Sequence, residues 1–288
     1  MQLKALLQEG RKRLISSGCE SARLDADLLL MHALNCPRSF LITHDNDEIN
    51  DRIVFRYRSL ISRRMAGEPI AYIVGYKEFW GLPFKVNKEV LIPRPDTELI
   101  VETALKFKSA SSVLDLGTGS GAIVLAIKHE RPEIKAFAVD VSDGALDVAK
   151  ENAARLNLEV CFIKSSWFSA LKSEKFDLIV SNPPYIEEND EHLKALSFEP
   201  IGALTSGKDG LDDIRVIVRD ARQFLNNGGA LLLEHGYNQG KNVRDILTEN
   251  GFSEVNTLKD LGENEGALYF IKRMNYNLHT KFPNVMLI

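Results

Sequence analysis

Cysteine is scarce in this chain of 288 residues, and it does not occur in a pattern typical of disulfides or metal sites. The three cysteines, Cys19, Cys36 and Cys161, are odd in number and widely spaced, without histidines at metal-ligand spacing. This excludes the disulfide framework of small secreted proteins. We therefore predict reduced thiols, no metal site and a cytoplasmic protein.

Long apolar runs and an excess of positive charge are also absent. Every hydrophobic stretch falls far short of the ~20 residues that a membrane-spanning helix needs, and the charged N-terminal stretch does not resemble a signal peptide. Lysine and arginine number 36 against 40 acidic residues, a net charge of -4. Binders of duplex DNA usually carry a basic face, so we expect no direct binding to nucleic acid. Because long apolar runs are absent, we also expect a soluble protein that does not bind membranes.

Helical periodicity is the only regular pattern in residues 1–74, which predicts a small helical bundle. Ser21 is expected to cap its second helix, and Gly67 to end its last long one. Aromatic and β-branched residues around a breaker group, Gly81, Leu82 and Pro83, then predict a β-hairpin connector over residues 75–95.

Strands and helices alternate over residues 96–273, and a C-terminal tail follows over residues 274–288. The predicted strands are Ser112–Leu116, Ile134–Asp140, Glu159–Lys164, Phe176–Ser181, Ala230–Glu234, Glu254–Leu258 and Ala267–Ile271. Helices are predicted between most of them, for example over Ala122–Glu130 and Asp143–Leu156. This alternation predicts an α/β domain with a mostly parallel sheet that is covered on both faces.

Three alternating glycines, Gly117, Gly119 and Gly121, lie between the first strand of this domain and its helix. Glycines there permit a tight turn and let a ligand approach the backbone closely. Their order, G-x-G-x-G, differs from the G-x-G-x-x-G of dinucleotide enzymes. Asp115 would repel a pyrophosphate but suits the ammonium and sulfonium of S-adenosylmethionine, which is therefore favoured over NAD. A glycine turn without a ligand is the alternative.

Side chains after the next two strands complete the expected cofactor site. Asp140 can accept hydrogen bonds from both ribose hydroxyls, each worth about 1.5–3 kcal/mol. Its alternative role is to cap the following helix. Trp167 and Phe168 follow the third strand, where they can pack against an adenine ring or belong to the core.

The stretch SNPPY, residues 181–185, follows the apolar fourth strand. Pro183 and Pro184 have no backbone N–H, so they form a stiff turn that presents carbonyl acceptors. Together with the side-chain carbonyl of Asn182, this turn can hold an NH2 group by both hydrogens while Tyr185 stacks on its plane. Positioning is the main assistance for so weak a nucleophile, and the acceptors stabilise the positive charge that develops on nitrogen. A glutamine amide and an adenine amino group both fit this arrangement; a purely structural turn is the alternative.

Over nearly its whole length, the sequence resembles the HemK-type release factor glutamine methyltransferases, and five stretches carry the resemblance. They are ARLDADLLLMHAL, RRMAGEPIAYIVGYKEFWGLPFKVNKEVLIPRPDTE, LDLGTGSG, SNPPYI and FEPIGALTSGKDGL. The resemblance implies a Rossmann-like, seven-stranded class I S-adenosylmethionine-dependent methyltransferase domain behind a helical domain that helps to grip a protein substrate. It also implies N5-methylation of the glutamine in the Gly-Gly-Gln motif of class I peptide chain release factors.

By position, the resemblance also assigns site residues. The expected cofactor-binding residues, with Asp115 added for its charge, are Asp115, Gly117, Thr118, Gly119, Ser120, Gly121, Asp140, Trp167 and Asn182. The expected catalytic and substrate-binding residues are Asn182, Pro183, Pro184 and Tyr185. Arg94, Thr97 and Glu98 are expected to help line the site, although Thr97 or Asp96 can equally cap the helix that follows.

Three departures from the family pattern are present: Ser166, where an acidic or amide residue is frequent, Gly266, where arginine is common, and the long tail. The alternative function is that of an adenine-N6 nucleic-acid methyltransferase, which must flip a base from the duplex and should bring a basic DNA-reading domain. A binding module without catalysis is a further alternative. We expect a monomer whose partner is the release factor.

Overall fold

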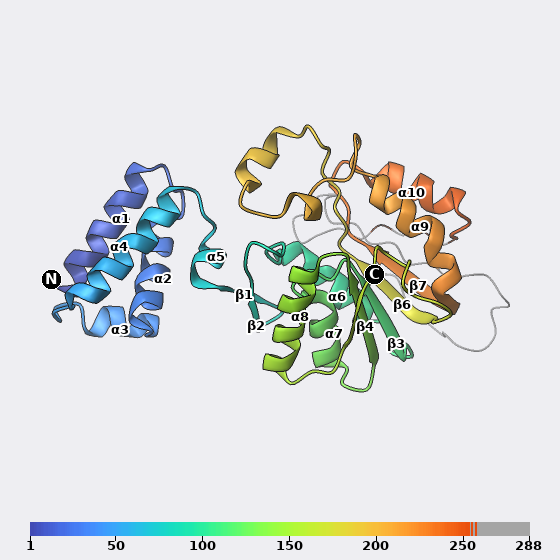
Figure 1. Ribbon diagram of the computed structural model, residues 1–288, viewed down its shortest axis with the longest axis horizontal. Coiled ribbons are helices and arrows are strands. Elements are labelled where there is room, and N and C mark those ends of the chain that lie inside the picture. The colour runs from blue at the N-terminus through green and yellow to red at the C-terminus, as the bar shows by residue number, and fades with distance from the viewer. Residues whose placement is uncertain (254, 256, 258–288) are drawn as a thin grey trace. The chain divides into compact units, whose positions relative to one another are not determined.

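The computed structural model describes residues 1–253, 255 and 257 of the chain (Figure 1). The chain forms two compact units. The first consists of residues 1–76 with 86–88, and the second begins with residues 77–85 and continues from residue 89. Each unit has a hydrophobic core of its own.

The first unit is a bundle of helices, as predicted. The helices are α1 Leu3–Ser16, α2 Ala22–Leu34, α3 Arg38–Thr43, α4 Asp51–Met65 and the short α5 Ile70–Val74. Leucines at helical spacing fill the core together with Tyr57. Gly10 makes room for this ring in α1, since a Cβ atom there would lie 2.0 Å from the tyrosine hydroxyl oxygen.

The two helix boundary predictions have different outcomes. Gly67 follows the end of α4 with φ +93°, as expected for a residue that ends a helix. Ser21 precedes α2 but does not accept from a helix N–H; its hydroxyl donates to a carboxylate oxygen of Asp25, 2.9 Å away. Asp25 is buried and also accepts from Arg64 at 2.6 Å. The predicted cap is therefore wrong: the backbone of Ser21 (φ -90°, ψ 17°) is not in the extended conformation of a capping residue, and its hydroxyl is turned to this ion pair.

The predicted β-hairpin is confirmed, with strands β1 Tyr76–Phe79 and β2 Leu82–Lys85. Its turn consists of Trp80 and Gly81, whose φ angles are +53° and +69°, as in tight hairpin turns. The prediction also placed Leu82 and Pro83 in the turn, but both residues belong to β2. A proline is tolerated there because both strands of a two-stranded sheet are edge strands, where a residue can lack a backbone N–H.

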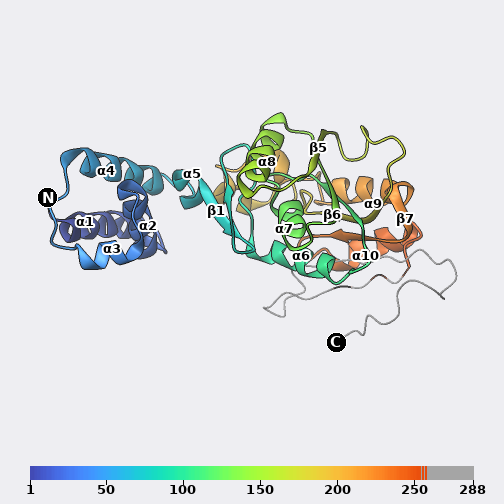
Figure 2. The same ribbon diagram turned by 90° about the horizontal axis from the view of Figure 1, so that it is seen from below.

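The second unit contains a five-stranded parallel sheet in the order β5-β4-β3-β6-β7 (Figure 1 and Figure 2). The strands are β3 Ser112–Leu116, β4 Lys135–Asp140, β5 Cys161–Lys164, β6 Phe176–Ser181 and β7 Leu225–Leu233. The predicted α/β fold is thus confirmed. Two further predicted strands, Glu254–Leu258 and Ala267–Ile271, lie outside the described residues apart from Val255 and Thr257, as do Gly266 and the tail.

Helices cover both faces of the sheet (Figure 1). On one face lie α6 Glu98–Leu105, α7 Ala122–Glu130 and α8 Asp143–Leu156; on the other lie α9 Asp212–Phe224 and α10 Gly240–Glu249. Successive residues of β3 alternate between the two cores: Val113 belongs to the first and Leu114 to the second. Because β4 and β6 lie on opposite sides of β3, the carboxyl end of β3 is the point where ligands bind in such sheets.

Strand β7 is the clearest difference from the predicted boundaries. It runs over Leu225–Leu233 and not over Ala230–Glu234. The stretch Asn-Asn-Gly-Gly is predicted as a loop from the sequence, but the structure places it inside the strand, as an irregularity where the register shifts between Phe176 and Leu178. Gly228 there has a φ of +77°, a backbone region that a regular strand does not use and that favours glycine.

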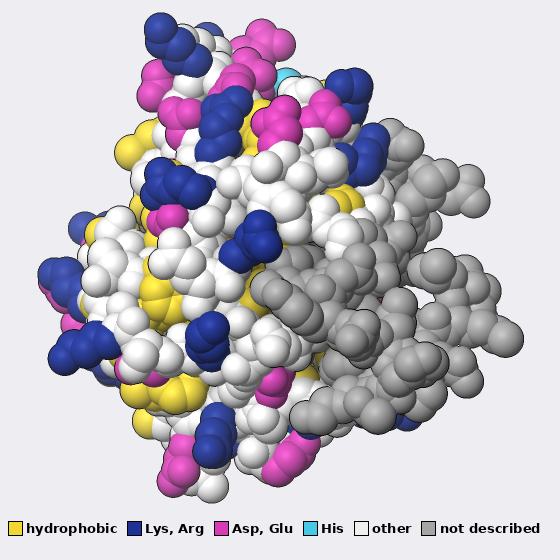
Figure 3. Space-filling view, turned by 90° about the vertical axis from the view of Figure 1, so that its right-hand side faces the viewer, with side chains coloured by type: hydrophobic (Ala, Val, Ile, Leu, Met, Phe, Trp, Pro, Cys, Tyr) yellow, Lys and Arg dark blue, Asp and Glu magenta, His cyan; other side chains and the backbone are white. Residues whose placement is uncertain are grey.

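Acidic and basic side chains alternate on the part of the surface shown in Figure 3, and neither sign gathers into a continuous patch among the described residues visible there. Among the residues that the structure covers, no helix is both long and apolar enough to cross a membrane. Among the described residues, no group of three or more His, Cys, Asp or Glu side chains lies close enough together to hold a metal ion.

Candidate active site

The glycine loop connects the carboxyl end of β3 to the start of α7. Gly117, Gly119 and Gly121 have φ angles of +68°, +55° and +81°, a region that favours glycine. A Cβ atom on Gly121 would lie 2.9 Å from the side chain of Leu125 in α7 and 3.3 Å from that of Ala149 in α8, so this glycine also lets the loop pack closely against both helices. No heavy atom lies within 4 Å of a Cβ position on Gly119, which leaves the middle of the loop open to a ligand.

A cavity of about 390 Å³ lies beside this loop, within the size range of small-molecule sites. The predicted site residues that line it are Arg94, Thr97, Gly117, Thr118, Gly119, Ser120, Asp140, Trp167, Asn182 and Pro184. Ser166 also lines it. The structure therefore brings together residues that follow four different strands. Five other predicted residues are not part of this lining: Glu98, Asp115, Gly121, Pro183 and Tyr185.

Asp115 lies beneath the glycine loop and is fully buried. Its Oδ2 accepts a hydrogen bond from the Thr118 hydroxyl at 2.7 Å, while Oδ1 has no partner among the described residues. Burial raises the pKa of this carboxyl group to about 7, against the effect of the Thr118 hydrogen bond. Asp115 thus holds the loop from behind and is separated from the cavity by it.

Asp140 ends β4 and reaches the cavity directly. Its Oδ2 accepts from the backbone N–H of Gly119 at 2.9 Å, and its Oδ1 accepts from that of Ser142 at 2.9 Å. Burial raises the pKa of Asp140. The alternative role as a helix cap is wrong, because Ser142 caps α8 by accepting from the N–H of Ala145. Asp140 instead ties the glycine loop to the end of the neighbouring strand.

The two aromatic residues after β5 take different places. Trp167 lines the cavity with φ +50°, and its ring would lie 3.3 Å from a Cβ atom on Gly117. Its indole N–H donates to Asp213 at 3.2 Å. Phe168 belongs to the core, where it stacks on Phe224 with ring centroids 4.6 Å apart. Sequence reasoning missed Asp213, because nothing in the first turn of α9 indicates an indole 46 residues earlier.

Asn182 extends from the end of β6 into the cavity lining. Its side-chain NH2 donates to the hydroxyl oxygen of Thr97 at 3.1 Å, so its carbonyl oxygen remains as an acceptor for a ligand. Thr97 precedes α6 but makes no capping hydrogen bond, so the capping alternative is wrong for this residue; Asp96 lies in the 3-10 turn Pro95–Thr97.

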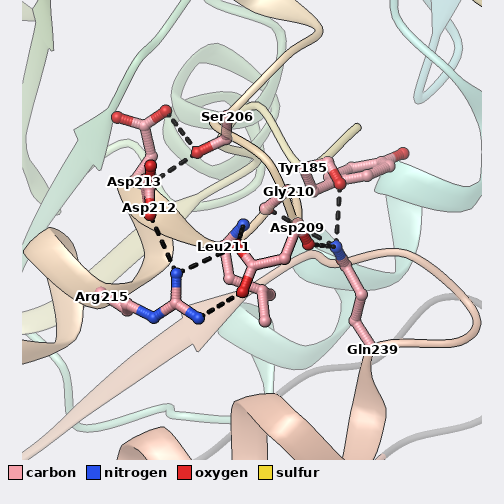
Figure 4. Close-up of polar contacts among 9 residues, drawn as sticks. All are labelled: Tyr185, Ser206, Asp209, Gly210, Leu211, Asp212, Asp213, Arg215 and Gln239. Atoms are coloured by element: carbon pink, nitrogen blue, oxygen red, sulfur yellow. Dashed lines mark hydrogen bonds and ion pairs between the residues drawn. The ribbon is translucent and has the colours of Figure 1, made fainter. Parts of the chain in front are cut away.

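The last residue of the motif points inward. The Tyr185 hydroxyl donates to Oε1 of the buried Glu234 at 3.4 Å, and the Tyr185 carbonyl accepts from the Gln239 side chain at 2.9 Å (Figure 4). Burial raises the pKa of Tyr185, so the hydroxyl stays protonated. Neither Glu234 nor Gln239 was predicted as a site residue. The usable signal was that Glu234 ends a predicted strand whose carboxyl end lies at the same edge of the sheet as the motif.

A loop before α9 lies against the main chain of this motif (Figure 4). Gln239 also donates to the carbonyl of Asp209 at 3.3 Å. Asp209 and Asp212 both accept from Arg215, at 3.0 and 2.9 Å, which fixes the loop to α9. At its tip, a Cβ atom on Gly210 would lie 2.2 Å from the Tyr185 carbonyl oxygen.

Two of the loosely assigned residues are now placed. Arg94 lines the cavity and pairs with the buried carboxylate of Glu199, which also accepts from the backbone N–H of Ile92 at 3.1 Å. Glu98 lies away from the cavity lining and accepts from the backbone N–H of Trp80 at 2.7 Å. Arg94 therefore belongs to the candidate site, whereas Glu98 supports the hairpin.

The sheet order, the glycine loop and the cavity at the strand ends define a Rossmann-like methyltransferase. Residues 95–198 match the family described as methyltransferase small domain. Two solved structures share the fold: a methyltransferase from Pyrococcus furiosus (TM-score 0.53, 22% identity, covering 74% of this chain and 98% of that one) and a 16S rRNA methyltransferase from T. thermophilus in complex with AdoMet and guanosine (TM-score 0.53, 21% identity, covering 69% and 50%).

Closer relatives define the family. Residues 5–75 match the PrmC N-terminal domain. The chain is 45% identical to a release factor glutamine methyltransferase of Aliivibrio fischeri, covering 92% of this chain and 95% of the relative, and 51% identical to that of Pseudomonas aeruginosa, covering 85% and 91%. It belongs to the family of release factor glutamine methyltransferases, which confirms the resemblance seen in the sequence.

Proposed function

We propose that this protein transfers the methyl group of S-adenosyl-L-methionine to the side-chain amide nitrogen, N5, of the glutamine in the Gly-Gly-Gln motif of class I peptide chain release factors. The observation that carries this proposal is that Asn182 and Pro184 line the same cavity as the glycine loop. Relatives at 45% and 51% identity are named for the release factor and for glutamine, which supports the choice of substrate. The cytoplasm, where release factors act, is the proposed location.

The residues of the cavity fit the proposed cofactor. The open middle of the glycine loop at Gly119 admits a ligand against the backbone. Asp140 provides a carboxylate for ribose hydroxyls, and Trp167 provides an aromatic wall for an adenine ring. When ionised, Asp115 adds negative charge from behind the loop, which suits a cationic ligand. When bound, S-adenosylmethionine supplies an electrophilic methyl group on its sulfonium.

The task of the protein is to position a weak nucleophile. The lone pair of an amide nitrogen is delocalised into its carbonyl group, so orientation accounts for most of the assistance. The Asn182 carbonyl and the main-chain carbonyls of the proline turn offer acceptors to the substrate NH2, and the prolines offer no competing N–H. The same acceptors stabilise the positive charge that develops on nitrogen. The amide proton is then shed, so no strong base is required.

Asp140→Asn is expected to weaken S-adenosylmethionine binding by about 10–100-fold, because hydrogen bonds to a charged acceptor are worth about 1.5–3 kcal/mol. Isothermal titration calorimetry measures this dissociation constant. Asp147→Asn is the matched control, since Asp147 is exposed on the next helix and should leave binding unchanged. Equal affinity of the Asp140 variant and the wild type would remove Asp140 from the cofactor site.

Incubation with methyl-labelled S-adenosylmethionine tests the function itself. The wild type is given, in parallel, a class I release factor, the same factor with alanine in place of the motif glutamine, and duplex DNA. Label on the intact factor alone, placed on the glutamine by mass spectrometry, is the expected result. Label in DNA alone would establish the adenine-N6 alternative, and no label in any sample would favour a binding module.

A further inference from the structure

Glu234 is a buried carboxylate next to the candidate site that the reaction described above does not use. It directly follows β7 and is 3% exposed. Its Oε1 accepts from the Tyr185 hydroxyl, while its Oε2 makes no regular hydrogen bond to the described residues. Its backbone N–H donates to the Ser181 carbonyl at 3.0 Å, which fixes it beside the motif. Burial of an incompletely paired carboxylate is costly, so a role for it is expected.

Thr97 connects this carboxylate to Asn182. The Thr97 hydroxyl oxygen accepts from the Asn182 NH2 at 3.1 Å, which leaves the hydroxyl hydrogen to donate elsewhere. The Thr97 hydroxyl and the Asn182 amide both lie close enough to Glu234 to lower the pKa of its carboxyl group. An ionised carboxylate can only accept hydrogen bonds. The hydrogen of the Thr97 hydroxyl is therefore available to Glu234, whose Oε2 has no hydrogen-bond partner among the described residues.

We propose that Glu234 is a positioning residue that determines which end of the Asn182 side chain faces the substrate. With a carboxylate at its far end, the hydrogen-bond chain has one direction: Asn182 donates to Thr97, and Thr97 donates to Glu234. The NH2 of Asn182 is thereby held inward and its carbonyl oxygen is presented to the cavity. The orientation of an amide follows from the network around it, and here a single carboxylate decides that network.

Replacing the carboxylate of Glu234 with an amide removes the fixed direction of this hydrogen-bond chain. A glutamine at position 234 can donate to Thr97, after which Thr97 can donate to Asn182 and turn its NH2 outward. The NH2 group of Asn182 would then face the NH2 group of the substrate in the cavity, and the substrate would lose its hydrogen-bond acceptor. The inference rests on the proposed function, because it assigns a direction to the acceptor that the reaction needs.

The first test compares Glu234→Gln with Glu249→Gln, a matched control whose side chain is exposed on α10. Methyl transfer to the release factor is followed at saturating S-adenosylmethionine. For Glu234→Gln we expect kcat to fall at least tenfold, while the melting temperature and the dissociation constant of S-adenosylmethionine stay as in the wild type. The control should keep the wild-type kcat. A Glu234→Gln enzyme within twofold of the wild type would overturn the inference.

The pH profile provides a readout that a merely structural role would not change. Burial raises the pKa of Glu234 to about 7, with the charge of Asp96 adding to it. Two other titratable groups adjoin it: Tyr185 stays protonated, and His235, whose pKa burial lowers to about 4, stays neutral. Below about pH 7 Glu234 gains a proton and can donate, so the wild-type kcat should rise with pH through this range. The Glu234→Gln enzyme should lack this rise.

A second pair of variants decides the matter if Glu234→Gln unfolds. Thr97→Val removes the hydroxyl that relays the direction, and Thr97→Ser keeps it. Serine should restore much of the kcat that valine loses; equal kcat values for the two variants would overturn the inference. A wild type that transfers no label to the release factor would instead overturn the proposed function, so the two failures are distinguishable.

Discussion

Asn182→Ala is expected to lower the rate of methyl transfer by about 10²–10³-fold, the effect of removing one oriented dipole from a site of developing charge. The variant loses the side-chain acceptor in the cavity lining and leaves Thr97 without its donor. The backbone carbonyls of the proline turn remain, so binding of the release factor should change less than the rate. Single-turnover transfer of labelled methyl groups, measured at saturating substrate, separates the two effects.

Asn238→Ala is the matched control for this prediction, because Asn238 is an exposed asparagine of the same unit that does not line the cavity. It should transfer methyl groups at the wild-type rate. If Asn182→Ala matched it, the acceptor role of this side chain would be refuted, whichever nitrogen the enzyme methylates.

Gly210→Ala is expected to cost about 3 kcal/mol or more of the free energy of unfolding and to reduce activity with it. Its φ of +71° alone costs an L-residue about 1–2 kcal/mol. A methyl group there would also lie 2.2 Å from the Tyr185 carbonyl oxygen and 2.7 Å from the Gln239 amide nitrogen, and such overpacking typically adds about 1–3 kcal/mol. Urea unfolding of the purified variant measures the change.

Gly81→Ala separates the two contributions. Gly81 has nearly the same φ, +69°, in the same unit, but no heavy atom lies within 4 Å of its Cβ position. It should show the backbone cost alone, about 1–2 kcal/mol, and retain activity. Equal losses of unfolding free energy at the two positions would mean that the loop tip moves aside for the methyl group. The contact of the loop with the motif would then not contribute to stability.

The local sequence pattern was sufficient to predict most of the fold. The bounds of α7 and α8 agree with the sequence because Gly121 and Ser142 mark their starts, and the apolar stretches of β3 and β6 agree because both strands are buried throughout or nearly so. The start of β7 did not follow from the pattern. Its Asn-Asn-Gly-Gly stretch has the composition of a turn, and it lies inside the strand because Leu225 before it and Ala230 after it both pair with β6.

The candidate site divides in the same way. The glycine loop, Asp140, Trp167 and Asn182 each follow a strand, so the rule that ligands bind at carboxyl ends was enough to bring them together. Their supporting partners were not predictable. Thr97 lies 85 residues from Asn182, and Glu234 lies 49 residues from Tyr185, so packing of the whole unit decides these contacts. The same packing places the Tyr185 hydroxyl against Glu234.

The hydrogen bonds of Gln239 have a consequence for the order of events during folding. This side chain links the Tyr185 carbonyl to the loop at Asp209, and it accepts from the N–H of Gly236. The Asn-Pro-Pro-Tyr turn is therefore completed by a residue 54 positions downstream, and such long-range contacts form slowly. A nascent chain that ends before Gln239 would already contain the whole motif and still be unable to hold it in its working shape.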